Sequence, residues 1–165
     1  MRIPEELIPL AVLGVGGFVL VVITIVHGFG LDMVIRRYKN RAEGLRKRGW
    51  HPHLAVFVFA GAILGLLFVH IVEICIWGAI LWRSGLVSDY HVAVYFSANT
   101  YTTLGMGSMV LPHAWHELCP IIAISGLFTF AWTTSELFNI VGYQRELVSH
   151  LSARRKERRS SAGNH

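Results

Sequence analysis

The sequence predicts an all-α membrane protein with three transmembrane helices and one segment that enters the membrane and turns back. Its 165 residues suit a single domain. Only 15% of them are charged and 53% are hydrophobic, whereas a soluble domain carries about 25% charged residues. Three long apolar runs lie at residues 7–26, 54–82 and 120–141. Each reaches the length of about 20 residues that a helix needs to cross the hydrocarbon core.

The first run, 7–26, has Thr24 as its only polar side chain. The residues before it are acidic rather than basic, and no small-residue cleavage site follows it. We therefore expect a retained membrane anchor rather than a signal peptide. The second run, 54–82, is longer than a perpendicular span requires, so we expect it to tilt or to protrude from the membrane.

Residues 89–112, between the second and third runs, have a different composition. They are moderately apolar and rich in Thr, Ser and Gly, and they are too few to cross the membrane twice as helices. Irregular backbone is stable at membrane depth only where protein buries it or where it lines a water-filled cavity. The segment is therefore predicted to be a re-entrant loop.

Lysine and arginine gather on one side of the three runs. Thirteen of the fifteen follow the first or the third run, and Arg2 and Arg83 lie on the other side. The positive-inside rule then places the N-terminus outside and the C-terminus in the cytoplasm of a plasma-membrane protein. We expect a basic cytoplasmic loop at 36–53 and a basic cytoplasmic tail at 144–165. The tail either contacts anionic lipid or is solvated and disordered, and no nucleic-acid partner is expected.

The re-entrant segment contains a T-x-G-x-G stretch at residues 103–107. A cation that loses its water shell needs oxygens at short range, and backbone carbonyls supply them when successive peptides point inward. Alternate positions then need left-handed dihedrals, which glycine adopts at little cost. The preceding residues, 89–101, can form a short helix with Ser88 or Asp89 as its N-cap. The negative dipole end of that helix would face the cation.

Residues 54–143 resemble the pore domain of tetrameric potassium channels. The family's filter reads T-T-V-G-Y-G, and the matching ion-binding residues here are Thr102, Thr103, Leu104, Gly105, Met106 and Gly107. The Tyr95-Phe96 pair falls where the family often carries two pore-helix aromatics. The resemblance implies an outer helix at 54–82, a pore helix at 89–101, a filter at 102–107 and an inner helix at 116–143. An additional N-terminal transmembrane helix, within residues 1–35, precedes this domain.

The resemblance implies the pore-forming subunit of a monovalent cation channel, built as a four-fold homotetramer. No cofactor is expected beyond the permeating cation, which is K⁺ or both K⁺ and Na⁺. Met106 replaces an aromatic that braces the filter in the family, and Ser108 replaces an acidic residue, so we expect weak selectivity. The alternative is a non-conducting scaffold or partner subunit with the same fold. An enzyme is not expected, because no nucleophile accompanies the one acid-base pair, His70 and Glu73.

Ionisable residues inside a membrane are functional candidates by default. His70 and Glu73 lie one turn apart on the second run, and we expect Glu73 to be hydrogen-bonded behind the filter or paired with His70. Glu136 is expected either in a ring of four carboxylates near the inner entrance or in hydrogen bonds between helices. The resemblance implies a hinge at Gly126 and a cavity lined by Phe130, Thr134 and Ser135. No metal site is expected beyond the filter cations.

Further histidines lie near the ends of the runs. Four copies of His113, His116 and Glu117 at the outer mouth could bind zinc or sense pH, or these side chains are simply solvated. His27 and Asp32 end the first run, where we expect solvation at the membrane surface or hydrogen bonds between helices.

Small residues predict where the first two runs approach each other. Gly61 and Gly65 form a G-x-x-x-G pair on the second run, and Gly14 and Gly17 lie on the first. Because small residues allow close helix contacts, we expect these glycines at the packing surface between the two runs.

Overall fold

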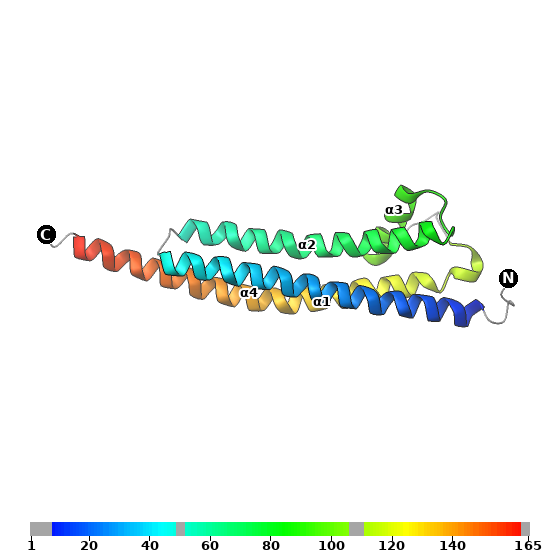
Figure 1. Ribbon diagram of the computed structural model, residues 1–165, viewed down its shortest axis with the longest axis horizontal. Coiled ribbons are helices and arrows are strands. Elements are labelled where there is room, and N and C mark those ends of the chain that lie inside the picture. The colour runs from blue at the N-terminus through cyan, green and yellow to red at the C-terminus, as the bar shows by residue number, and fades with distance from the viewer. Residues whose placement is uncertain (1–7, 49–51, 106–110, 163–165) are drawn as a thin grey trace. The chain divides into compact units, whose positions relative to one another are not determined.

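The computed structural model describes residues 8–48, 52–105 and 111–162. Those residues form four α-helices and a short 3₁₀ helix, and no β-strand occurs among them (Figure 1). The elements are α1 (Ile8–Arg48), α2 (Pro52–Arg83), α3 (Tyr90–Tyr101), η2 (His113–Trp115) and α4 (Leu118–Ala162). Met106, Gly107 and Ser108, which the sequence places in or beside a filter, lie outside the described residues.

Three of the helices are long and apolar enough to cross a membrane. The candidate spans are Leu10–Arg48, His53–Arg83 and His113–Lys156. The second and third apolar runs lie within their candidate spans, and the first run lies within its span from Leu10 onward. The prediction of an all-α fold with three helices able to span a membrane is therefore confirmed for the residues that the structure describes.

The chain divides into two compact units. Unit 1 comprises Met1–Phe29 and Val69–Trp132, and unit 2 comprises Gly30–Phe68 and Thr133–His165. Each unit contains parts of α1, α2 and α4, and α3 belongs to unit 1.

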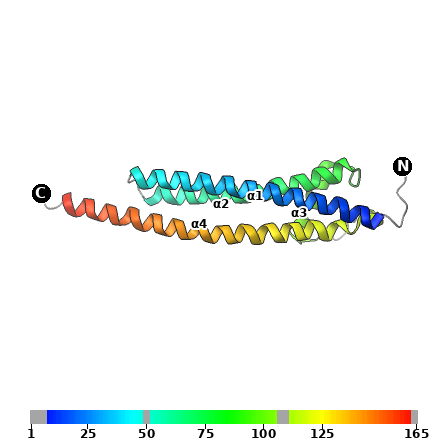
Figure 2. The same ribbon diagram turned by 60° about the horizontal axis from the view of Figure 1, so that its bottom comes forward.

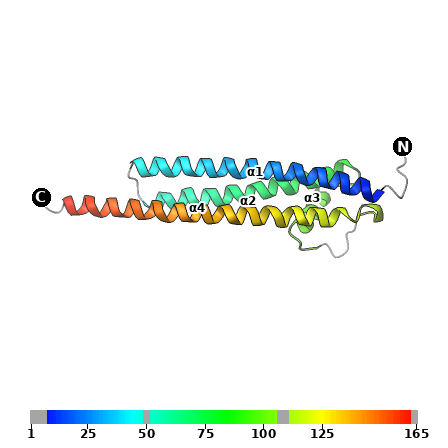
Figure 3. The ribbon, with the colours of Figure 1, turned by 90° about the horizontal axis from the view of Figure 1, so that it is seen from below.

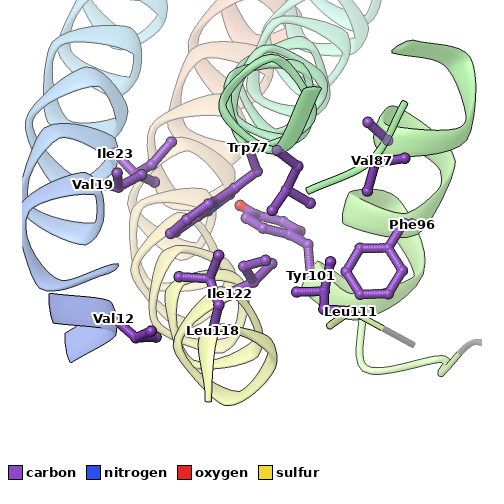
Figure 4. Packing of buried hydrophobic residues seen from close by; sticks show 12 residues of the cluster. Val12, Val19, Ile23, Trp77, Val87, Phe96, Tyr101, Leu111, Leu118 and Ile122 are labelled. Atoms are coloured by element: carbon purple, nitrogen blue, oxygen red, sulfur yellow. The ribbon is translucent and has the colours of Figure 1, made fainter. Parts of the chain in front are cut away.

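The core of unit 1 packs α3 against α2 and the start of α4. Trp77 of α2 and Tyr101 of α3 are both fully buried there, together with Ile122 of α4. Figure 4 shows the Tyr101 ring extending from α3 into this core, with its hydroxyl oxygen directed inward. The indole of Trp77 donates a 3.0 Å hydrogen bond to Ser125 Oγ on α4, so its one polar group is satisfied.

In unit 1, α3 lies against α2 and α4 (Figure 3). Gly78 of α2 faces the backbone of Val94 on α3, and a Cβ at this glycine would come within 2.8 Å of the Val94 Cα. Small residues at such crossings let helices approach closely. This close packing sets the position of α3 in the unit.

The segments predicted as a basic loop at 36–53 and a basic tail at 144–165 are largely helical instead. α1 continues without a break to Arg48, and α4 continues to Ala162. The reason is that both segments are rich in Arg, Lys, Glu, Ala and Leu, which are strong helix formers. Three basic residues also lie in the last turn of α1, where they interact favourably with the helix dipole.

Unit 2 holds these extensions together with a small apolar cluster. Its buried members come from all three helices and are Ala42, Leu45, Ala55, Leu147 and Leu151. The buried Tyr38 hydroxyl of α1 donates a 2.9 Å hydrogen bond to Gln144 Oε1 of α4. The last part of α1 lies alongside the first part of α2 (Figure 2). Burial of the apolar stripe therefore adds to propensity in keeping both segments helical.

The glycine predictions are confirmed at one position. Gly65 of α2 faces Val34 of α1, whose Cγ2 lies 3.1 Å from a Cβ built on the glycine. Gly61, Gly14 and Gly17 have no such neighbour within 4 Å, so the expectation for these three is wrong. Two other glycines of α1 pack against α4, where Gly16 faces Ile121 and Gly28 faces Trp132.

The unit 2 cluster predicts the behaviour of Leu147→Ala. The side chain is 3% exposed, and truncation of a buried leucine costs about 2–5 kcal/mol. We expect trypsin to cut the basic end of α4 faster in this variant than in the wild type. Glu146→Ala, which changes an exposed neighbour, serves as the control. Equal cleavage rates for the two variants would contradict the packing described for unit 2.

Candidate functional site

The helix α3 begins at a side-chain cap. The Asp89 carboxylate accepts a 2.9 Å hydrogen bond from the Val92 amide, and Asp89 itself has extended backbone dihedrals. An acidic N-cap satisfies one of the amides that a helix start leaves free, and its charge suits the positive end of the helix dipole. The expected short helix with Asp89 as N-cap is confirmed.

Residues Thr102 to Gly105 fold back over the C-terminal end of α3. The amides of Leu104 and Gly105 both donate to the Asn99 carbonyl, at 2.8 Å and 3.3 Å. The Thr102 amide and hydroxyl both donate to the Ala98 carbonyl. These bonds satisfy carbonyls that the end of a helix leaves without partners. The four residues are all exposed in the single chain, and Leu104 is 78% exposed.

Two residues of this cap have left-handed backbone dihedrals. Gly105 has φ +81°, as its place in the T-x-G-x-G stretch predicts, and Thr103 has φ +58°. The second value was not expected, because a β-branched residue rarely adopts this region. It costs about 1–2 kcal/mol relative to the right-handed region. The surrounding hydrogen bonds must therefore hold Thr103 in place.

A buried polar network attaches the last residue of α3 to the rest of unit 1. The Tyr101 hydroxyl donates a 2.5 Å hydrogen bond to Glu73 Oε2 of α2. It also lies 2.9 Å from His70 Nδ1 and 2.6 Å from Thr129 Oγ1 of α4. The second oxygen of Glu73 lies 2.7 Å from His27 Nδ1 of α1. The tyrosine thereby joins three helices at the point where α3 ends.

The hydrogen bonds around Glu73 indicate which partner atoms carry a proton. Ionised Glu73 accepts one hydrogen bond on each oxygen, from Tyr101 and from His27. Each imidazole then carries its proton on Nδ1, so that His70 donates to the Tyr101 oxygen. The side chains of His27 and Glu73 are both 0% exposed. A buried carboxylate of this kind is stable only when it is fully hydrogen-bonded.

Gly126 of α4 packs directly against the end of α3. A Cβ built on this glycine would collide with the backbone carbonyl oxygen of Tyr101. The position therefore requires glycine for close approach. The hinge expected at Gly126 stays a prediction.

The structure brings together part of the predicted set of polar residues. Glu73 Oε2 lies 3.8 Å from His70 Nδ1, in agreement with the expected pairing of these two residues. The same oxygen accepts the hydrogen bond from Tyr101 at the end of α3. His27 is buried in the same network and makes a hydrogen bond between helices, which is one of the two expectations for it, although its link to Glu73 was not foreseen. A signal for this was present: His27 and Glu73 are equally far along the chain from residue 50. An antiparallel helix pair would place them opposite each other.

The remaining candidates lie on α4. Phe130 stacks on the His70 ring, with centroids 4.3 Å apart. Thr134 and Ser135 are exposed in unit 2. Glu136 accepts a 3.2 Å hydrogen bond from Asn139 within the same helix. The cavity-lining and entrance roles of these residues stay predictions.

His113 and His116, which are expected from the sequence at an outer mouth, form a smaller contact. The rings of His113 and His116 meet edge to face, with centroids 5.1 Å apart. Among the residues that the structure describes, the group of three metal-ligating side chains is His27, His70 and Glu73, and the mouth residues do not form such a group within one chain.

Comparison with known families decides the class of protein. Residues 54–142 match the sequence model of a family described as ion channels. The chain belongs to this ion-channel family. The match covers α2 from Leu54, all of α3, and α4 as far as Gly142, so it contains Glu73 and Tyr101 of the channel but not His27. Comparisons with curated proteins and with solved structures give no match.

The contact at Gly126 predicts that Gly126→Ala destabilises the channel. The added methyl must displace the backbone of Tyr101, and overpacking of this kind costs about 1–3 kcal/mol. Gly142→Ala on the same helix is the matched control, because no atom of another element lies within 4 Å of its added Cβ. The control should be neutral or stabilising by up to about 1 kcal/mol. Thermal unfolding in detergent distinguishes them, and equal midpoints would contradict the close approach.

Proposed function

We propose that this ion channel conducts monovalent cations through a pore formed by four copies of the chain. In each copy, residues 102–107 supply the oxygens of the selectivity filter. The observation that carries the proposal is the end of α3, where exposed residues with left-handed dihedrals follow directly on a firmly held tyrosine.

The length of α3 supports a re-entrant position. Its 12 residues extend about 18 Å as a helix, which is less than the hydrocarbon thickness of about 30 Å. α3 is packed in unit 1 with parts of all three spanning helices, so it lies beside apolar segments without crossing a membrane itself. The irregular backbone after α3 must be buried in protein or line a water-filled cavity. Other copies of the chain provide both surroundings when they enclose a water-filled pore.

The exposed surface of unit 1 supports assembly. Large apolar side chains of α3, of the segment directly after it and of α4 remain exposed in the single chain, namely Tyr95, Leu104, Ile124, Leu127 and Phe128. One chain contributes a single filter segment, whereas a ring of carbonyls needs several. A closed four-fold arrangement gives every copy the same contacts. We therefore propose a homotetramer, with lipid around its outer surface.

The charge distribution supports one orientation. Thirteen of the fifteen basic residues belong to unit 2. By the positive-inside rule this unit faces the cytoplasm and the loop after α3 faces outward. We propose a plasma-membrane location with anionic lipid beside the basic ends of α1 and α4.

The filter assignment predicts that Gly105→Ala abolishes cation flux. The alanine methyl strains a residue at φ +81° by about 1–2 kcal/mol, and the strain is repeated in every copy around the ring. Gly85→Ala is the matched control, because Gly85 has φ +74° in the turn after α2 and no neighbour within 4 Å of the added methyl. It should keep the flux of the wild type in liposomes. Wild-type flux through Gly105→Ala would contradict the assignment of residues 102–107 to the filter.

Met106 predicts the selectivity of the pore. A flexible thioether braces the filter less than an aromatic ring does, and Ser108 supplies no carboxylate nearby. We expect weak preference for K⁺ over Na⁺, and we expect Met106→Tyr to increase it. Reversal potentials under opposed K⁺ and Na⁺ gradients measure both channels. A strongly K⁺-selective wild type that Met106→Tyr leaves unchanged would show that this position does not set selectivity.

A further inference from the structure

The helix α1 lies outside the residues that match the ion-channel family, yet it reaches the network at the end of α3. Its His27 is 0% exposed, and its Nδ1 lies 2.7 Å from Glu73 Oε1. The His27 ring also packs against the rings of His70 and Trp132, each with a centroid distance of 5.3 Å. This part of α1 thus meets both α2 and α4 at one polar point.

The connection from α1 to the proposed filter has only one intermediate residue. His27 donates to one oxygen of Glu73, and the other oxygen accepts from the hydroxyl of Tyr101. Tyr101 is the last residue of α3, and Thr102 follows it directly. We refer to these three side chains as the His27–Glu73–Tyr101 clasp.

The same residues invite a second interpretation, a metal site. Ligand atoms of His27, His70 and Glu73 all lie within 4.8 Å of one another, and such ligands suit zinc. However, zinc with bonds of about 2.0–2.1 Å holds its tetrahedral ligands about 3.3 Å apart. The 2.7 Å between His27 and Glu73 is instead a hydrogen-bond distance. Each oxygen of the Glu73 carboxylate already accepts a hydrogen bond. The geometry therefore favours the clasp over a metal site.

We propose that α1 is a positioning element of the pore and that His27 is the residue through which it acts. His27 holds the Glu73 carboxylate in the orientation that accepts the Tyr101 hydroxyl, and this bond fixes the end of α3 from which the filter starts. Without His27, one oxygen of a fully buried carboxylate loses its donor. Glu73 then turns toward other donors, and Tyr101 is held less firmly. The effect on conduction rests on the proposed function, whereas the effect on the order of residues 101–105 does not.

A set of three variants tests the clasp. His27→Ala removes the donor. His27→Asn restores one, because the Asn amide nitrogen is attached at the same carbon as the imidazole Nδ1. Thr24→Ala is the control on the same helix, since the Thr24 hydroxyl donates to the Leu20 carbonyl of its own helix. Each protein is purified as the full chain and its assembly state is measured before reconstitution.

Two readouts are taken from each variant. The first is hydrogen exchange of the Leu104 and Gly105 amides, which are bonded to the Asn99 carbonyl. We expect exchange about ten-fold faster in His27→Ala, because an unmatched buried acceptor destabilises the structure around it. The second is K⁺ flux per assembled channel in liposomes, with an expected loss of about five-fold or more for the same reason. His27→Asn should return both readouts to within about two-fold of the wild type, and Thr24→Ala should change neither.

The outcomes separate the clasp from its alternatives. Unchanged exchange in His27→Ala overturns the clasp, and so does a loss that His27→Asn does not rescue. Stoichiometric zinc in the purified wild type, absent from His27→Ala, overturns it in favour of a metal site. A wild type that conducts no cations removes the proposed function, while the exchange measurement still decides the clasp. Faster exchange with unchanged flux limits the role of His27 to local order and contradicts its proposed action on the pore.

Discussion

A buried carboxylate at the end of a short helix is the interaction on which the rest of unit 1 depends. Moving a carboxylate out of water costs several kcal/mol unless its oxygens are hydrogen-bonded. Glu73 meets this condition through Tyr101 and His27, one bond on each oxygen. The three side chains come from three different helices, so satisfying one charge also fixes where α1, α2 and α3 meet.

The consequence reaches the residues after α3. Because Tyr101 is held by its hydroxyl and Gly126 of α4 packs against its carbonyl, the chain leaves the helix at a fixed point. The next residues then adopt dihedrals that an unconstrained chain avoids, at Thr103 and at Gly105. Strained backbone of this kind persists only where the surroundings determine it, and it gathers at functional sites. Both residues lie within the part of the chain that matches the ion-channel family.

Much of this architecture could be predicted from the sequence. Apolar length alone gives the three spanning helices, and the cap at Asp89 gives the start of α3. The extensions of α1 and α4 were missed because charged segments were taken for loops, although Leu147 and Leu151 lie on one face of the helix and are buried there. The role of His27 was missed for the same reason. Once a loop is assumed at 36–53, nothing sets the register between α1 and α2, and the opposition of His27 and Glu73 disappears.

Other features could not be predicted by any reading of one sequence. The sequence around Gly126 does not predict that the Tyr101 carbonyl lies against it, because that contact depends on how α3 and α4 cross. The dihedrals of Thr103 likewise contradict its intrinsic preference, and the hydrogen bonds that fold residues 102–105 back over the end of α3 hold them. Local rules fail here in and beside the proposed filter, and functional sites are where such failures are expected.

The most direct test of a cation filter at the end of α3 is an experimental structure of the assembled protein in K⁺ and in Tl⁺. We predict a particle of four chains with ion density on its four-fold axis, beside the backbone carbonyls of residues 103–107. The anomalous signal of Tl⁺ should appear at the same positions. A monomeric or dimeric particle, or a four-fold particle without ion density beside these carbonyls, would contradict the account.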